Sequence, residues 1–288
     1  MKTENSPADK EGNPMKIAQY FDKNRIRLGI VRENALIPIE FEGDMIDFIL
    51  QKPEVAPSGD SIPMDRIQLA APVTRPTKII ALGLNYPDHA VEGKAQVPEA
   101  PLIFAKFPNS LIGSGQTVSW NLNITKKVDY EAELAVVIGK KACDIPEAQA
   151  MEAVFGYTCA NDVSARDLQF GDKQWVRGKS LDTFCPLGPW IVTKDEIPAP
   201  HDLKIYCHLN GQTLQDSHTG EMFFKVPFLV SFLSRHFTLM PGDLILTGTP
   251  SGVGVFRTPR IYLKDGDEVV VEIEGIGRLV NFCRTFER

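Results

Sequence analysis

Two glutamates, Glu131 and Glu133, stand two residues apart in a mostly apolar segment, DYEAELAVVIG at 129–139. Apolar side chains in this segment recur with a period of two, which predicts a β-strand with both glutamates on one face, about 7 Å apart. Neighbouring carboxylates repel each other unless a cation lies between them or one of them is protonated. The segment therefore has two interpretations: a cation site, or an exposed edge strand with a solvated acidic face.

A third carboxylate, Asp162, ends the next predicted strand, where a side chain can point into a cleft. Carboxylates without nearby Cys or paired His are hard oxygen ligands, which suit Mg²⁺, Mn²⁺ or Ca²⁺ and not zinc. The alternative is a coincidence, because E-x-E is a common spacing and Asp at a strand end often forms a turn.

An acid–base pair is indicated by His89 and Glu92, because an i, i+3 spacing on a helical turn lets the carboxylate orient the imidazole. The alternative is a surface histidine with an incidental neighbour. Donors that suit a small anionic substrate follow at Arg166, Gln169 and Lys179, and at Thr249 in a glycine-rich segment.

The sequence lacks the motifs of two other functional classes, nucleotide-binding proteins and serine hydrolases. The glycine-rich segment TPSGVG at 249–254 does not have the P-loop order G-x-x-x-x-G-K-[ST], which argues against nucleotide binding. No G-x-S-x-G occurs, which argues against a serine hydrolase.

The composition of the 288 residues is that of a globular protein, with 43% hydrophobic and 24% charged residues. A net charge of −6 without a Lys/Arg run argues against nucleic acid and anionic membranes as partners. No apolar stretch approaches the roughly 18 residues of a membrane span, and the polar first 14 residues do not resemble a secretory signal. The five scattered cysteines contain no CxxC pair, which predicts a reducing cytosol and a cytoplasmic protein.

The chain is predicted to have three parts. Residues 1–14 are expected to be a disordered tail, residues 15–72 a small β-rich N-terminal domain, and residues 77–288 the catalytic domain, with Pro72 and Pro76 in the linker. Strand patterns outnumber helical ones and no regular βαβ alternation occurs, so the expected fold class is α+β, mainly β.

Three local signals add detail to this prediction. Asn210-Gly211 between two apolar runs predicts a β-hairpin turn. An apolar run predicts a helix at 226–236, and SARDLQ predicts a short helix capped by Ser164.

Five segments between Lys78 and Phe286 together resemble the fumarylacetoacetate hydrolase family, over two thirds of the chain. They are GLNYPDHAVE, DYEAELAVVIG, GYTCANDVSARDLQ, RGKSLDTFCPLGPW and GDLILTGTPSGVG, in that order. The resemblance implies a catalytic domain built on a rolled mixed β-sheet, a small N-terminal domain and a homodimer.

The resemblance also implies roles for the candidate residues. One divalent cation per chain, Mg²⁺ or Mn²⁺ and in some members Ca²⁺, would be held by Glu131, Glu133 and Asp162. His89 and Glu92 would form a dyad on a lid that closes over the substrate, with Gly93 permitting closure. Lys179 corresponds to the family's active-site lysine, while Arg166, Gln169 and Thr249 match positions that line the substrate site.

These roles predict a metal-dependent hydrolase that cleaves a C–C bond in a β-diketo, acylpyruvate-like 2-oxo acid, in carbohydrate or aromatic acid catabolism. An alternative on the same site is an oxaloacetate-type decarboxylase or a 2-hydroxy-dienedioate isomerase or tautomerase, because stabilisation of an enolate serves all of these reactions. A second alternative is a non-catalytic dicarboxylate-binding homologue, although such a protein would not need His89, Glu92 and Lys179 together.

Overall fold

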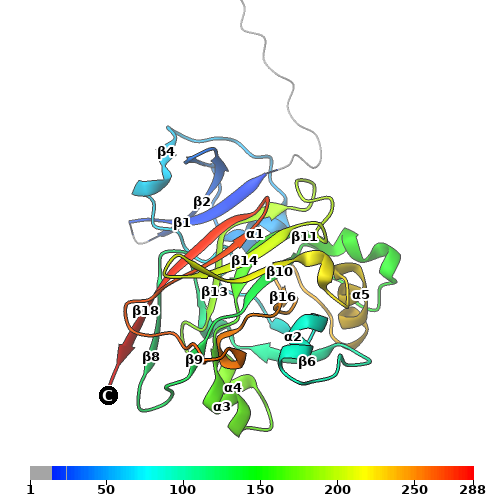
Figure 1. The fold of residues 1–288 in the computed structure, drawn as a ribbon. Helices are drawn as coiled ribbons and strands as arrows, with labels where there is room; N and C mark the ends of the chain where they lie inside the picture. The colour runs from blue at the N-terminus through cyan, green and yellow to red at the C-terminus, as the bar shows by residue number, and fades with distance from the viewer. Residues whose placement is uncertain (1–14, 24) are drawn as a thin grey trace, which may run out of the picture.

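The computed structural model describes residues 15–23 and 25–288; the predicted tail at 1–14 lies outside the described residues. Most of the described secondary structure is β, and five short α-helices accompany the strands (Figure 1). The α+β, mainly β class is therefore confirmed. No helix in the described part of the chain is both long and apolar enough to cross a membrane.

The larger sheet has eleven strands, in the order β4-β3-β2-β1-β13-β11-β10-β16-β5-β6, with β7 beside β13. Most neighbours are antiparallel, but β16 and β5 run parallel, so the sheet is mixed. Because β1 pairs with β13, the N-terminal strands continue this same sheet. The bounds are β1 Lys16–Asp22, β2 Arg25–Arg32, β3 Ala35–Pro38, β4 Ile62–Pro63, β5 Ile79–Gly83, β6 Leu102–Lys106, β7 Leu111–Ile112, β10 Ala132–Ile138, β11 Val154–Asn161, β13 Cys185–Thr193 and β16 Leu244–Leu246.

A second sheet of five strands has the order β15-β14-β17-β18-β8, and β9 pairs with β12 in a short ribbon. The hairpin between β14 and β15 turns at Asn210 and Gly211, whose φ angles of 50° and 79° are those of the predicted turn. The bounds are β8 Thr117–Asn121, β9 Val128–Asp129, β12 Ser164–Ala165, β14 Lys204–Leu209, β15 Gln212–His218, β17 Glu268–Ile273 and β18 Gly277–Phe286.

The helices are short and lie around the sheets (Figure 1). The predicted helix at 226–236 is confirmed as α5, with a proline in its first turn. The predicted Ser164 cap is wrong: Ala165 precedes α3, and the Ser164 hydroxyl instead donates to the Asp162 carbonyl. The α-helices are α1 Met45–Gln51, α2 Pro87–Glu92, α3 Arg166–Gly171, α4 Val176–Lys179 and α5 Val226–His236, and the 3₁₀ turns are η1 Met64–Arg66, η2 Pro108–Ser110, η3 Glu147–Ala153, η4 Thr219–Glu221 and η5 Gly254–Phe256.

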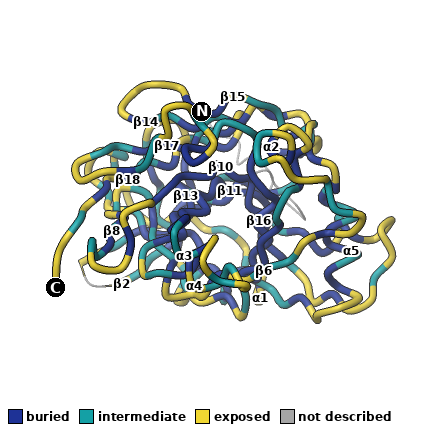
Figure 2. Tube along the Cα trace, turned by 60° about the horizontal axis from the view of Figure 1, so that its bottom comes forward, coloured by how far each residue is buried: buried dark blue, intermediate teal, exposed yellow. Residues whose placement is uncertain are grey.

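Strand β10 runs through the middle of the molecule and is buried on both faces (Figure 2). Leu134 and Val136 join the core cluster that includes residues of the second sheet and α5. Ala135 and Val137 face the opposite way, into a cluster that also contains residues of α1. Strand β10 pairs with β11 on one side and with β16 on the other. The site described next lies at the N-terminal end of β10.

Candidate active site and cation centre

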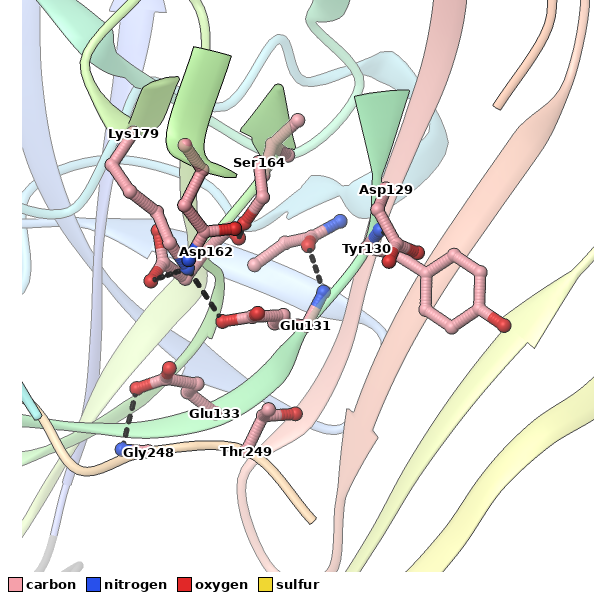
Figure 3. A network of polar contacts seen from close by, with 12 residues as sticks. Asp129, Tyr130, Glu131, Glu133, Asp162, Ser164, Lys179, Gly248 and Thr249 are labelled. Carbon is pink, nitrogen blue, oxygen red and sulfur yellow. Dashed lines mark hydrogen bonds and ion pairs between the residues drawn. The ribbon is translucent and has the colours of Figure 1, made fainter. Parts of the chain in front are cut away.

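Three buried carboxylates, Glu131, Glu133 and Asp162, each offer one oxygen atom within 4.8 Å of the others (Figure 3). Glu131 directly precedes β10, Glu133 is the second residue of β10, and Asp162 directly follows β11. The antiparallel pairing of these strands brings Asp162 opposite Glu131, whose carbonyl accepts from the Asp162 N–H at 2.9 Å. Glu131 is 5% exposed and Glu133 1%, which excludes the solvated edge strand.

The charge at this cluster is unevenly balanced. Burial raises the pKa of Glu131, but the Lys179 and Arg166 cations outweigh burial and bring this pKa down to about 2. Burial raises the pKa of Glu133 well above its ordinary value, and the nearby Asp162 and Glu131 carboxylates raise it further. Among the described residues, Glu133 has no ion-pair partner within 4 Å and accepts only from the Gly248 N–H at 2.7 Å.

The carboxylate set therefore fits a hard divalent cation. Three hard oxygen donors converge, and the Glu133 charge lacks a neutralising partner that a divalent cation would supply.

Two buried lysines contact the cluster. Lys179 lies with its Nζ 2.7 Å from Glu131 and 2.6 Å from Asp162. Lys106, at the end of β6, was not among the residues predicted from sequence; its Nζ lies 2.6 Å from the other Asp162 oxygen and also donates to the Lys179 carbonyl. Both side chains are about as buried as the core, so each charge is compensated by carboxylates rather than by solvent.

Arg166 sits beside Glu131 and is 3% exposed. Its Nη1 is 2.7 Å from Glu131 and 2.9 Å from the Gln169 side-chain oxygen, and its Nε donates to Asp129 at 2.8 Å. Its Nη2 is buried without a hydrogen-bond partner among the described residues. The guanidinium thus has one nitrogen, with two N–H groups, that lacks a partner among the described residues in a polar site, which suits a carboxylate of a ligand.

Thr249 is also buried, at the start of the glycine-rich segment. Its hydroxyl accepts from the Gln215 side chain at 2.8 Å. The same Gln215 side chain accepts from the Ala132 N–H at 2.9 Å, so this threonine is fixed relative to β10.

Helix α2 carries the predicted dyad, with His89 Nδ1 2.8 Å from Glu92 Oε1. The second oxygen of Glu92 accepts from the Gly252 N–H at 3.0 Å, and Asp88 accepts from the Ser251 hydroxyl at 2.7 Å. Two carboxylates of α2 therefore bind the glycine-rich segment. His89 is 8% exposed, which excludes the surface-histidine alternative.

Phe256 covers the dyad, with ring centroids of Phe256 and His89 6.0 Å apart. A Cβ atom on Gly93 would lie 3.2 Å from the same phenylalanine ring, closer than most real Cβ contacts. Gly93 itself has an ordinary right-handed φ of −78°. The glycine therefore provides space for the Phe256 cover, and its backbone conformation does not require glycine.

The fumarylacetoacetate (FAA) hydrolase C-terminal family model matches residues 78–284. The chain belongs to the fumarylacetoacetate hydrolase family. The curated "Oxaloacetate tautomerase Fahd2a, mitochondrial" of Rattus norvegicus is 51% identical over 221 residues, which cover 76% of this chain and 70% of the relative. The Homo sapiens "Oxaloacetate tautomerase FAHD2A, mitochondrial" is 50% identical over 222 residues, with the same coverage.

Solved structures of the family are similar over almost the whole chain. The fumarylacetoacetate hydrolase from Exiguobacterium antarcticum has a TM-score of 0.86 and 36% identity, covering 94% of this chain and 100% of its own. The 2-hydroxyhepta-2,4-diene-1,7-dioate isomerase from Mycobacterium marinum has a TM-score of 0.80 and 34% identity, covering 95% and 100%. The family fold is thereby confirmed, and the family members support an enzyme.

The prediction of a cytoplasmic protein is wrong, because the curated relatives of this family member are named as mitochondrial enzymes. The prediction rested on cysteines without a pairing pattern. Such cysteines indicate a reducing environment, and this property does not identify the compartment.

Proposed function

We propose that this enzyme interconverts the enol and keto forms of a small dicarboxylic 2-oxo acid, with oxaloacetate as the first substrate to test. The observation that carries the proposal is the buried His89, which pairs with Glu92 and is close enough to the carboxylate cluster for its charge to lower the pKa of Glu131. Tautomerisation needs a proton-transfer group and stabilisation of a negative oxygen, and it consumes no water. The curated relatives named as oxaloacetate tautomerases support this reaction over C–C hydrolysis.

Glu131, Glu133 and Asp162 would hold the divalent cation. When bound, the cation would act as a Lewis acid towards the keto oxygen of the substrate. Lys179 adds a positive charge beside two of these carboxylates. Burial lowers the pKa of Lys179, but Asp162 and Glu131 outweigh it and raise this pKa, so the ammonium remains charged.

The free Nη2 of Arg166 binds a carboxylate of the substrate. Gln169 and Glu131 occupy Nη1, and Asp129 occupies Nε, so the guanidinium cannot rotate freely. A preorganised arginine loses little entropy when it binds an anion, which favours a substrate with a second carboxylate.

His89 moves the proton. In ketonisation the enol hydroxyl loses one proton and C3 gains one, so the sum of atoms is unchanged. Glu92 holds Nδ1, which leaves Nε2 to exchange protons with the substrate. The Gly252 N–H fixes the other oxygen of Glu92, so the imidazole is held in one orientation during the transfer.

C–C hydrolysis is the second candidate, because the Exiguobacterium antarcticum structure with a TM-score of 0.86 is named a fumarylacetoacetate hydrolase. In that reaction His89 would deprotonate a water molecule. The buried His89 and its Phe256 cover favour a reaction in which bulk water is excluded.

The test is a substrate panel with Mg²⁺, Mn²⁺ or EDTA. The ultraviolet absorbance of enol-oxaloacetate should decay faster with enzyme and cation than with either alone, without release of pyruvate. Pyruvate release would indicate a decarboxylase. Cleavage of acylpyruvates without acceleration of enol decay would reject the tautomerase and favour the hydrolase, and binding without any turnover would indicate the non-catalytic homologue.

A further inference from the structure

Asp129 is a completely buried carboxylate that belongs to neither the predicted cation site nor the dyad. Its Oδ1 accepts from the N–H groups of Tyr130 and Gly254, at 2.9 and 2.8 Å. Its Oδ2 accepts from Arg166 Nε at 2.8 Å and from the Val255 N–H at 3.0 Å. All four partners are donors, and only an ionised carboxylate can accept from all of them.

The four contacts join two parts of the site that are far apart in sequence. Arg166 presents its free Nη2, while Gly254 and Val255 belong to η5, the turn that ends at Phe256. The Gly254 backbone approaches so closely that an added Cβ would lie 2.7 Å from Asp129 Oδ1 and 1.9 Å from the Ile261 carbonyl. The η5 turn is therefore seated directly on the Asp129 carboxylate.

We propose that Asp129 is a positioning residue that sets Arg166 and the Phe256 cover relative to one another. Asp129 has two roles in this arrangement, which we call its two arms. In the first arm, its hydrogen bond to Arg166 Nε orients the guanidinium. The other arm holds Phe256 against His89. The first arm rests on the proposed function, because it assumes that Arg166 receives a carboxylate of the substrate.

Asp129→Asn tests both arms. In asparagine an NH₂ group, which cannot accept a hydrogen bond, replaces one of the two carboxylate oxygens. If it takes the place of Oδ2, Arg166 loses its acceptor, and if it takes the place of Oδ1, Gly254 loses its acceptor. A lost hydrogen bond to a charged group corresponds to roughly a tenfold change in an equilibrium constant. The variant should therefore raise KM for oxaloacetate about tenfold and also lower kcat, because the Phe256 cover loosens.

Asp243→Asn is the matched control. Asp243 is also completely buried, pairs with Lys78, and accepts from the Lys78 and Met240 N–H groups and from the Thr77 hydroxyl. It lies at the other end of β16 from the site. Its substitution should lower the melting temperature, as Asp129→Asn does, while KM and kcat stay within about twofold of wild type.

Two further variants separate the arms. Arg166→Gln should raise KM, and adding Asp129→Asn to it should raise KM no further. Phe256→Ala should lower kcat while the Kd of oxalate, measured by calorimetry with Mg²⁺ present, stays unchanged.

The proposal would be overturned if Asp129→Asn and Asp243→Asn changed KM and kcat equally. It would also be overturned if the increase in KM of the Asp129→Asn/Arg166→Gln double variant equalled the product of the increases in the two single variants. Oxalate binding separates this inference from the proposed function. If wild type binds oxalate and Asp129→Asn weakens that binding about tenfold, the positioning role stands even where oxaloacetate is not tautomerised. If oxalate binding is unchanged, the Arg166 arm fails even where wild type is an active tautomerase.

Discussion

Glu133→Gln should have opposite effects on stability with and without a divalent cation. Glu133 is 1% exposed and has no ion-pair partner among the described residues. Glutamine has the same shape, and its side-chain oxygen can still accept from the Gly248 N–H. Because the pKa of Glu133 is raised, the wild type without a cation must take up a proton at this carboxyl when it folds, whereas glutamine is neutral already. The substitution therefore removes the cost of burying this carboxyl and changes little else.

The size of the effect follows from the geometry. Two unit charges 4.8 Å apart, the limit within which the cluster's oxygens lie, repel by roughly 3.5 kcal/mol at an effective dielectric constant of about 20. Lys179 and Lys106 neutralise part of the neighbouring charge, so we expect a net gain of about 1–3 kcal/mol in the free energy of unfolding in EDTA. A cation at about 100 times its Kd stabilises the wild type by about 2.7 kcal/mol, and Glu133→Gln should forfeit most of this gain.

The assay is thermal unfolding of both proteins in EDTA and in excess Mn²⁺. Without the cation the variant should melt roughly 2–6 °C above wild type. With Mn²⁺ the melting temperature of wild type should rise until it equals or exceeds that of the variant. Glu272→Gln, at a partly exposed ion pair with Arg278, is the control and should shift neither curve. A variant that melts below wild type in EDTA, or that gains as much from Mn²⁺ as wild type does, would refute the reasoning.

Three further predictions concern single residues. His89→Gln should lower kcat by about 10²–10⁴-fold because proton transfer is lost, while the Mn²⁺ affinity measured by calorimetry stays unchanged; an unaltered kcat would remove the dyad from the reaction. Lys106→Met should lower the free energy of unfolding, measured by urea denaturation, by about 3 kcal/mol, because Asp162 loses one of its two buried cationic partners. Lys78→Met removes a lysine that is 31% exposed and should lower this free energy clearly less. Equal losses in the two variants would contradict the role of burial. Burial, followed by the Lys225 charge, lowers the pKa of His201 to about 4, so as the pH drops the unfolded chain binds the proton before the folded chain does, and the free energy of unfolding should decrease between about pH 6.5 and 4. The melting temperature should therefore be lower at pH 5 than at pH 7 in wild type, and the difference should be smaller in His201→Gln. Equal differences in the two proteins would contradict this prediction.

Much of the cation site was predictable because its pattern is local. The alternation around Glu131 and Glu133 defines one face of a strand, and the two apolar clusters on β10 follow the same alternation. The spacing of His89 and Glu92 is likewise contained within one helical turn. In these cases neighbouring residues in the sequence are also neighbours in the site.

Lys106 and Asp129 were not predicted, because their partners come from distant segments. A lysine at the end of an apolar strand ordinarily reaches solvent, since burying its charge is costly. Lys106 is buried only because Asp162, 56 residues away, compensates the charge. Asp129 reads as the polar start of a strand, and its partners lie 37 and 125 residues further along the chain.

The misassigned Ser164 cap has a similar origin. A serine before a helical pattern ordinarily accepts from the helix N-terminus. Here the Ser164 hydroxyl donates to the Asp162 carbonyl at 2.9 Å, and β12 pairs with β9 at this point. Tertiary packing around the carboxylate cluster thus overrides the local preference.

The joining of β1 to β13 has a consequence for the chain as it emerges and folds. Ile17 and Lys16 pair with Ile191 and Val192, and β13 is almost entirely buried. An apolar strand with an uncovered edge presents free N–H and C=O groups to other chains and promotes aggregation. We therefore expect the N-terminal strands to protect this sheet edge from association with other chains. A shortened chain that begins after them would precipitate through β13, although every residue of the candidate site would still be present.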